Sequence, residues 1–210
     1  MLRNIVYTLL VVVLAIGCTQ TSTTISFDKY GAKPDSKENS SALLYNLLEE
    51  IRTSDAITPL TITFSKGRYD FYDDGAFECE YYISNHDQTN PKKVGFNLEG
   101  LENITIDGQG SEFIFHGRMI PFALVNTKNI RLKNFSIDFE LPAIRQLEIL
   151  DVEKDNGNII AKIHPEGNYR VEDGKLIIKG EGYEIQPFTS LGFNSNRTLT
   201  YMRGDIDFNP

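Results

Sequence analysis

Phe96-Asn-Leu-Glu-Gly-Leu-Glu-Asn-Ile-Thr-Ile-Asp-Gly108 superimposes on Phe122-Ala-Leu-Val-Asn-Thr-Lys-Asn-Ile-Arg-Leu-Lys-Asn134 at an offset of 26 residues. Beyond these two copies, Phe113 falls on Phe139 at the same offset. Apolar residues alternate with polar ones inside each copy, as they do in strands that bury one face. The paired positions are Phe96/Phe122, Leu98/Leu124, Asn103/Asn129, Ile104/Ile130, Ile106/Leu132 and Phe113/Phe139.

A repeat of this length is typical of one rung of a solenoid. Each copy is too short to bury its own apolar face, so the next copy has to cover it. Asn103 and Asn129 suit a tight corner, because asparagine tolerates the left-handed backbone and stacked amides can hydrogen-bond along the solenoid axis. Two unrelated pairs of strands remain the alternative, since two copies are a small sample.

The N-terminus has the pattern of an export signal. The apolar run from Ile5 to Ile16 has 12 residues, fewer than the roughly 20 that span a bilayer, so residues 1–17 are interpreted as a signal peptide. Ala15-Ile-Gly17-Cys18 is similar to a bacterial lipobox, in which cleavage leaves a lipidated cysteine. Residues 18–26 are therefore predicted to be a lipid anchor and tether. An ordinary signal cleaved near Gly17 is the alternative.

These signals predict an exported bacterial lipoprotein at the cell membrane or outer membrane, attached through its lipid anchor only. If Cys18 carries lipid, Cys79 has no partner and the chain has no disulfide. The formal net charge is −8 and Lys and Arg do not cluster, so nucleic acid is not an expected partner. No cofactor is expected. The histidines lack metal-ligand spacing and are predicted to be surface or loop residues: His86, His116 and His164.

Residues 27–140 are predicted to hold an N-terminal cap and the first rungs. Asn39, Ser40 and Ser41 are candidate N-caps of one helix whose apolar residues recur at helical spacing. Alternating strands follow at 60–64 and 68–72, and then a polar loop at 73–95. Asp107-Gly-Gln-Gly110 is interpreted as a turn between strands. The apolar residues of the helix are Leu43, Leu44, Leu47, Leu48 and Ile51.

The pattern changes from Leu141 onward. Short strands at 147–153, 158–163, 169–171 and 175–179 are separated by turns that contain Gly157, Gly167 and Gly174. Such hairpins cannot continue a 26-residue rung, so residues 141–200 are predicted to be an inserted antiparallel β-barrel or sandwich. Residues 201–210 are interpreted as a truncated return toward the solenoid. Because no C-terminal cap has appeared, we expect the front portion of a longer protein.

Two motifs point to a known fold. Tyr30-Gly-Ala-Lys-Pro-Asp35 with the helix from Ser41, and then Ile62-Thr-Phe-Ser-Lys-Gly-Arg-Tyr69, resemble the opening of the pectate-lyase-like superfamily. That resemblance implies an all-β fold, a right-handed parallel β-helix with an N-terminal capping helix. The cap covers an apolar end and strand edges that the first rung would otherwise expose.

The chain as a whole resembles glycoside hydrolase family 110, the bacterial exo-acting α-1,3-galactosidases. The most specific stretches are Phe27-Asp-Lys-Tyr-Gly-Ala32, Leu101-Glu-Asn-Ile-Thr-Ile-Asp-Gly-Gln-Gly110, Asn134-Phe-Ser-Ile-Asp-Phe-Glu140 and Arg203-Gly-Asp-Ile-Asp-Phe208. The resemblance implies removal of terminal α-1,3-linked galactose from branched, blood-group-B-type glycans and from linear ones. It also implies an inverting mechanism, barrel-like insertions in the β-helix and no cofactor.

Inversion requires one carboxylic acid and one carboxylate roughly 6.5 to 9.5 Å apart. Asp205 and Asp207 stand two residues apart, so on a strand they share a face and are candidates for substrate contact. Asp138 and Glu140 have the same spacing, and a solvated strand face explains either pair equally well. The resemblance implies that the catalytic aspartates lie beyond Pro210, so no catalytic residue is assigned within the chain.

Two other functions stay open at the level of sequence. One is a different β-helix polysaccharide hydrolase or lyase, such as a polygalacturonase, although its Asn-Thr-Asp, Asp-Asp and Gly-His-Gly elements are not recognisable here. The other is a surface lipoprotein that binds glycans without cleaving them. Asp73-Asp74 is a weak candidate for a catalytic dyad, because adjacent residues of an extended segment point to opposite faces.

Overall fold

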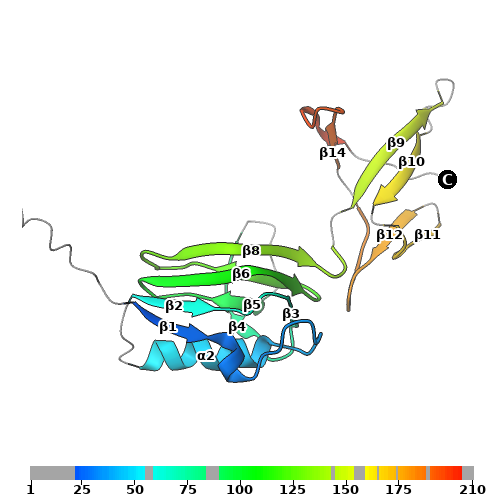
Figure 1. Cartoon of the computed structure of the whole chain (residues 1–210). Helices are drawn as coiled ribbons and strands as arrows, with labels where there is room; N and C mark the ends of the chain where they lie inside the picture. The colour runs from blue at the N-terminus through cyan, green and yellow to red at the C-terminus, as the bar shows by residue number, and fades with distance from the viewer. Residues whose placement is uncertain are drawn as a thin grey trace, which may run out of the picture.

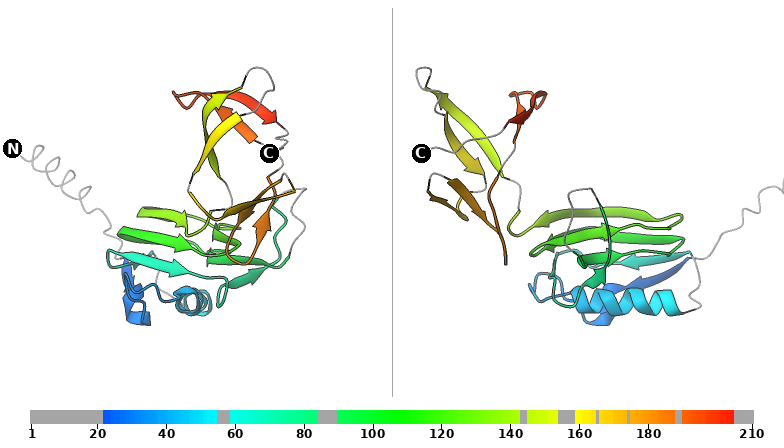
Figure 2. Two further views of the ribbon diagram at one scale, coloured as in Figure 1. Left: turned by 90° about the vertical axis from the view of Figure 1, so that its right-hand side faces the viewer. Right: turned by 180° about the vertical axis from the view of Figure 1, so that it is seen from behind.

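The computed structural model describes residues 22–54, 59–83, 90–142, 145–153, 159–164, 166–173, 175–187 and 190–204. The described residues between 22 and 142 form a stack of strands with one helix along its side (Figure 1). The described residues between 145 and 204, the hairpin region, lie beyond the carboxyl end of the stack. Two further views show the same separation (Figure 2). No helix among the described residues is long and apolar enough to cross a membrane.

The stack contains two sheets. The larger, five-stranded sheet has the order β1-β2-β6-β3 with β8 also on β6, and the three-stranded sheet has the order β4-β5-β7. All pairs in the larger sheet are parallel. The elements are β1 (Thr23–Ser26), η1 (Phe27–Tyr30), α2 (Ser41–Thr53), β2 (Leu60–Thr63), β3 (Arg68–Phe71), β4 (Phe77–Cys79), β5 (Lys92–Asn97), β6 (Ile104–Phe115), β7 (Met119–Ala123) and β8 (Arg131–Phe139).

The 26-residue repeat is a repeat of parallel strand pairs. Phe96 on β5 pairs with Phe122 on β7, and their rings stack at 4.4 Å. Ile106 on β6 pairs with Leu132 on β8, and the same column continues through Ile62 of β2 to Ile25 of β1. Residues 23–26, which the sequence assigned to the tether, therefore form β1, because Ile25 completes this apolar column.

The predicted pairing of Phe113 with Phe139 is wrong. Phe113 pairs with Ile137, and Phe139 pairs with Phe115 instead, because the offset between β6 and β8 falls from 26 to 24 between Asp107 and Ser111. Glycine and left-handed residues make this corner two residues longer on β6 than on β8, with φ of 51° at Gln109 and 87° at Gly110. The turn predicted at 107–110 is thus a local break in register within one long strand.

The core lies between the sheets and α2. Phe64, Phe71, Phe96, Phe113 and Phe115 are fully buried and contact one another in tilted, edge-to-face and stacked pairs. Such ring pairs add to the stabilisation that burial of their area already gives. The predicted helix begins at Ser41, where the Asn39 side-chain oxygen accepts the Ser41 N–H at 2.9 Å. Its buried apolar stripe consists of Leu44, Leu47, Leu48 and Ile51.

The hairpin region is antiparallel, as the turn pattern predicted. Its elements are β9 (Gln146–Val152), β10 (Ile159–His164), β11 (Tyr169–Glu172), β12 (Lys175–Lys179), β13 (Glu184–Ile185), β14 (Ser190–Phe193) and β15 (Leu199–Gly204). They form three small sheets, β10-β9, β11-β12-β13 and β14-β15. Leu176 and Ile178 of β12 are buried, whereas most apolar residues of β9 are exposed.

Candidate functional site

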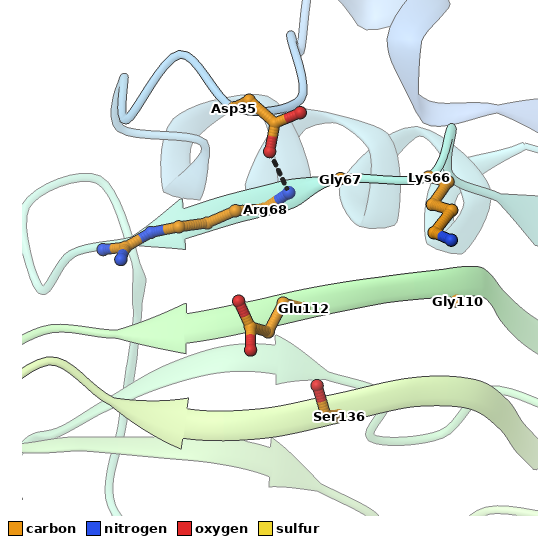
Figure 3. Close-up of a pocket in the computed structure, with 7 residues that line it drawn as sticks. All are labelled: Asp35, Lys66, Gly67, Arg68, Gly110, Glu112 and Ser136. Atoms are coloured by element: carbon orange, nitrogen blue, oxygen red, sulfur yellow. Dashed lines mark hydrogen bonds between the residues drawn. The ribbon is translucent and has the colours of Figure 1, made fainter.

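A polar hollow lies on the outer face of the larger sheet, across β3, β6 and β8 (Figure 3). Its volume is about 240 Å³. Arg68, Glu112 and Ser136 form a row through it, because Arg68 pairs with Glu112 and Glu112 pairs with Ser136 across the parallel strands. The hollow is lined by Asp35, Lys66, Gly67, Arg68, Gly110, Glu112 and Ser136.

One wall of the hollow is a loop fastened to the start of β3. Asp35 accepts the Arg68 backbone N–H at 2.9 Å and donates its own N–H to the Arg68 carbonyl at 2.8 Å. The loop comes so close at Gly67 that a Cβ there would lie 2.5 Å from the Cβ of Pro34. Only glycine fits at this position, which also has φ of 153°.

Some polar side chains of the hollow already have a hydrogen-bond or ion-pair partner, and others do not. The Arg68 guanidinium turns along its strand, donates to both carboxylate oxygens of Asp70 and pairs with Glu140 at 2.7 Å. Within the described part of the chain, the side chains of Lys66, Glu112 and Ser136 have no hydrogen bond or ion pair. A cation, a carboxylate and a hydroxyl at one open hollow suit a ligand rich in hydroxyl groups.

A second polar cluster lies where three strands of the sheet end side by side. Phe71, Phe115 and Phe139 are aligned as the last residues of β3, β6 and β8. The residue after Phe115 is His116, which lies in the loop between β6 and β7, as one of the two predicted alternatives has it. Its side chain is not at the surface, because the residue is only 6% exposed. Its ring stacks on Tyr72 with centroids 3.8 Å apart.

Both ring nitrogens of His116 face carboxylates. Nε2 lies 2.8 Å from Asp70, and Nδ1 lies 2.8 Å from Glu181 in the turn between β12 and β13. A carboxylate oxygen can accept a hydrogen bond from a ring N–H, so each nitrogen of His116 faces a hydrogen-bond partner. The other Glu181 oxygen accepts the Gly117 N–H at 3.0 Å. His116 thus joins the strand stack to the hairpin region.

Asp70 stays ionised although its side chain is almost completely buried. Burial by itself would raise the pKa of this carboxyl, but hydrogen bonds from Arg68 and then His116 outweigh burial and lower the pKa. The cluster is therefore a charge-paired junction, closed to solvent at Asp70. Among the described residues, no three His, Cys, Asp or Glu side chains gather in a metal-binding arrangement.

The residues that the sequence predicted to be functional lie partly within and partly outside the described part of the chain. Cys18, Asp205, Asp207 and His86 lie outside the described residues. Asp138 accepts the N–H of Phe139, whereas Glu140 pairs with Arg68, so the two acidic groups have different partners. His164 lies 3.4 Å from Glu148 on the exposed β9-β10 hairpin.

Sequence reasoning missed Arg68, Asp70 and Glu112. Arg68 and Asp70 flank the buried Tyr69 of β3, and Glu112 precedes the buried Phe113 of β6. The sequence did hold a signal for these residues, because charged residues at alternate positions of a strand indicate which side chains share its outer face.

The sequence matches known proteins along its whole length. Residues 145–210 match the family model described as GLAA-B β-barrel domain I. An α-1,3-galactosidase B of Parabacteroides distasonis is 43% identical over 179 residues, which are 84% of this chain and 29% of that protein. An α-1,3-galactosidase B of Phocaeicola vulgatus is 40% identical over 210 residues, 98% of this chain and 34% of that protein.

The similarity extends to a second group of relatives. An α-1,3-galactosidase A of Shewanella woodyi is 35% identical over 173 residues, 80% of this chain and 28% of that protein. The chain spans about a third of the length of these curated relatives.

Proposed function

The chain belongs to the α-1,3-galactosidase family, and from that membership we propose that it is part of an exo-acting enzyme that removes terminal α-1,3-linked galactose. Identity of 40% across nearly the whole chain is the observation that carries this proposal. The substrates are branched, blood-group-B-type glycans, and whether linear glycans are cleaved as well stays open. The mechanism is inverting, with one carboxylic acid protonating the leaving oxygen and one carboxylate activating water.

We place the catalytic carboxylates outside the described residues. The hollow offers Glu112 as its free carboxylate, since Asp35 accepts from the Arg68 backbone and Glu140 pairs with Arg68. A single free carboxylate cannot supply both the acid and the base of inversion. We therefore propose, as the family resemblance implies, that the pair belongs to segments beyond Pro210.

We further propose that the stack is the beginning of a right-handed parallel β-helix. The column from Ile25 through Ile62 and Ile106 to Leu132 supports this proposal, because it repeats one parallel register over four strands. Leu132 and Ile137 of β8 are 37% and 46% exposed. Another parallel strand stacked on β8 would cover these side chains and continue the column.

The galactosidase proposal is tested with two proteins. The 210-residue chain is compared with the chain extended through the coding sequence that follows Pro210, and galactose release is measured from an α-1,3-galactosyl trisaccharide. We expect release by the extended protein alone, with β-galactose as the first product seen by NMR. An α-1,4-galactosyl trisaccharide is the control substrate. Turnover by the 210-residue chain would refute the placement of the catalytic pair, and cleavage of polygalacturonate instead would refute the family activity.

Glycan binding without cleavage is the second candidate function for the 210-residue chain. The free side chains of Lys66, Glu112 and Ser136 in the hollow favour it. Glu112→Gln is expected to weaken binding of the trisaccharide at least tenfold, because a charged acceptor of sugar hydroxyls is lost. Glu102→Gln, on an exposed side chain outside the hollow, is the matched control. Equal binding by both variants would exclude the hollow as the site.

The lipid anchor is a separate proposal. We propose that Cys18 is acylated after export and that the protein contacts the membrane through this lipid alone. The motif Ala15-Ile-Gly17-Cys18 supports it. Metabolic labelling with palmitate should mark the wild-type protein and fail with Cys18→Ser, whereas Cys79→Ser should label normally. Labelling of the Cys18→Ser variant would contradict the anchor.

A further inference from the structure

Arg145 immediately precedes β9, where the chain enters the hairpin region. Its three guanidinium nitrogens are all buried, and none of them has a hydrogen-bond partner among the residues that the structure describes. A guanidinium cannot give up its proton at any pH that proteins experience, so this is a buried positive charge. An unpaired buried charge is strongly destabilising, and buried charges in folded proteins are normally paired and hydrogen-bonded. The position therefore calls for an acceptor.

The surroundings of Arg145 carry further positive charge. Arg118 lies over the ring of Tyr183 at 5.7 Å, and the Tyr183 hydroxyl donates to the Leu141 carbonyl over a long 3.4 Å. Burial raises the pKa of Tyr183, whereas the charges of Arg118 and Arg145 both act to lower it. Two cations thus act on one phenol, which is a favourable environment for an anion.

The acidic group that acts on Tyr183 already has hydrogen-bond partners of its own. Glu181 acts electrostatically on Tyr183, but its two oxygens accept from His116 and from the Gly117 backbone at 2.8 and 3.0 Å. Within the described ranges, no carboxylate pairs with Arg145. The acceptor that the buried charge calls for therefore lies outside the described residues.

We propose that Arg145 is a binding site for a small oxyanion, a carboxylate or sulfate group, with Tyr183 and Arg118 beside it. A guanidinium matches such groups because its planar fork donates two parallel hydrogen bonds to two oxygens. The Tyr183 hydroxyl has only a long bond to give up and can turn to donate to the anion. The group arrives either as a free anion or as part of an acidic sugar. This site is independent of galactose hydrolysis.

Substitution and anion titration together test the site. Arg145→Met removes the buried charge and keeps an unbranched apolar side chain, and Arg131→Met removes an exposed arginine of β8 as the matched control. In chloride, the midpoint of thermal unfolding of Arg145→Met should exceed that of the wild type by about 2–4 °C, as expected when a buried unpaired charge is removed. Arg131→Met should not show this gain.

Replacing chloride by millimolar sulfate at constant ionic strength should raise the midpoint of thermal unfolding of the wild type and of Arg131→Met. The rise should level off at high sulfate concentration, as it does when a site becomes filled. Arg145→Met should not respond. Sulfate also stabilises proteins generally by exclusion from their surfaces, and that effect is equal in all three proteins. An equal response of all three means an adventitious ion only and overturns the proposal. A lower midpoint of Arg145→Met in chloride overturns it as well.

Two further ligands distinguish the sources of the anion. Acetate supplies a free carboxylate and galacturonate supplies one on a sugar, with neutral galactose as the control. A midpoint that rises more with galacturonate than with acetate, and only while Arg145 is present, identifies an acidic sugar. Equal rises with the two carboxylates identify a free anion. If no anion raises the midpoint of thermal unfolding in an Arg145-dependent way, the proposed anion site is refuted, whatever the outcome of the galactose-release assay.

Discussion

The Asn129 side chain donates a hydrogen bond to the side-chain oxygen of Asn103 across 2.8 Å, so one amide pair joins the corners of two successive parallel strands. Both residues have left-handed backbones, with φ of 58° at Asn103 and 54° at Asn129. The pair combines the two properties that make asparagine suitable for a stacked corner, tolerance of this backbone and an amide that bonds to its neighbour.

Substitutions at Asn103 should separate these two contributions. Asn103→Gly keeps the left-handed backbone and loses the amide bond, so we expect a loss of about 1 kcal/mol in the free energy of unfolding. Asn103→Ala also strains the backbone and should lose about 2 kcal/mol. Urea denaturation measures both values. Equal losses for the two variants would show that backbone strain does not contribute.

Removal of His116 should loosen the junction between the stack and the hairpin region. His116→Leu leaves Asp70 and Glu181 without their shared hydrogen-bond partner, and a buried polar group that loses its partner costs about 1–3 kcal/mol. Hydrogen exchange at the Gly117 amide, which donates to Glu181, should accelerate in this variant. His164→Gln is the control, because His164 is exposed and lies 3.4 Å from Glu148. An unchanged exchange rate at Gly117 would argue against the junction.

The free energy of unfolding should depend on pH through the ionisation of Asp70. Its pKa is lower in the folded chain than its ordinary value, so the folded state binds this proton less readily than the unfolded state. The resulting stabilisation is complete above about pH 4, the ordinary range of aspartate, and disappears as the pH falls through the folded-state pKa. Asp70→Asn should remove this part of the acid dependence. Parallel acid-unfolding curves for the wild type and Asp70→Asn would contradict this role of Asp70.

Gly67 should be much less tolerant than a glycine with open space around it. A Cβ at Gly67 would meet Pro34 at 2.5 Å and Asp35 at 2.9 Å, so Gly67→Ala is expected to lose about 3 kcal/mol. Gly100 has φ of 73° and nothing within 4 Å, so Gly100→Ala should lose about 1 kcal/mol from backbone strain alone. Thermal unfolding compares the variants, and a smaller loss at Gly67 than at Gly100 would disprove the close approach.

The sequence predicted local structure and the repeat well, because both depend on nearby residues. The alternation around Phe96 and Ile106 specified which faces are buried, and their pairing with Phe122 and Leu132 is confirmed. The prediction failed at Phe113, where the number of residues in a corner decides the pairing. No pattern of apolar residues records that number.

The polar cluster could not be predicted in the same way. His116 meets partners 46 and 65 residues away, one before it on β3 and one after it between β12 and β13. Only the assembled fold brings these positions together. Asp205 and Asp207 remain candidates for substrate contact, and the carboxylate pair of the proposed mechanism remains a prediction for segments beyond Pro210.

The two extra residues of β6 at Gly108–Gly110 shift the pairing with β8 by two positions, so Phe139 meets Phe115. A shift of two residues keeps each side chain on its own face, so a corner can change its length while apolar residues still meet in the core. The whole hairpin region is inserted at the end of a strand, directly after β8. Proteins of this design can acquire new parts at their corners without redesigning their interiors, and a search for relatives by a fixed repeat length would overlook them.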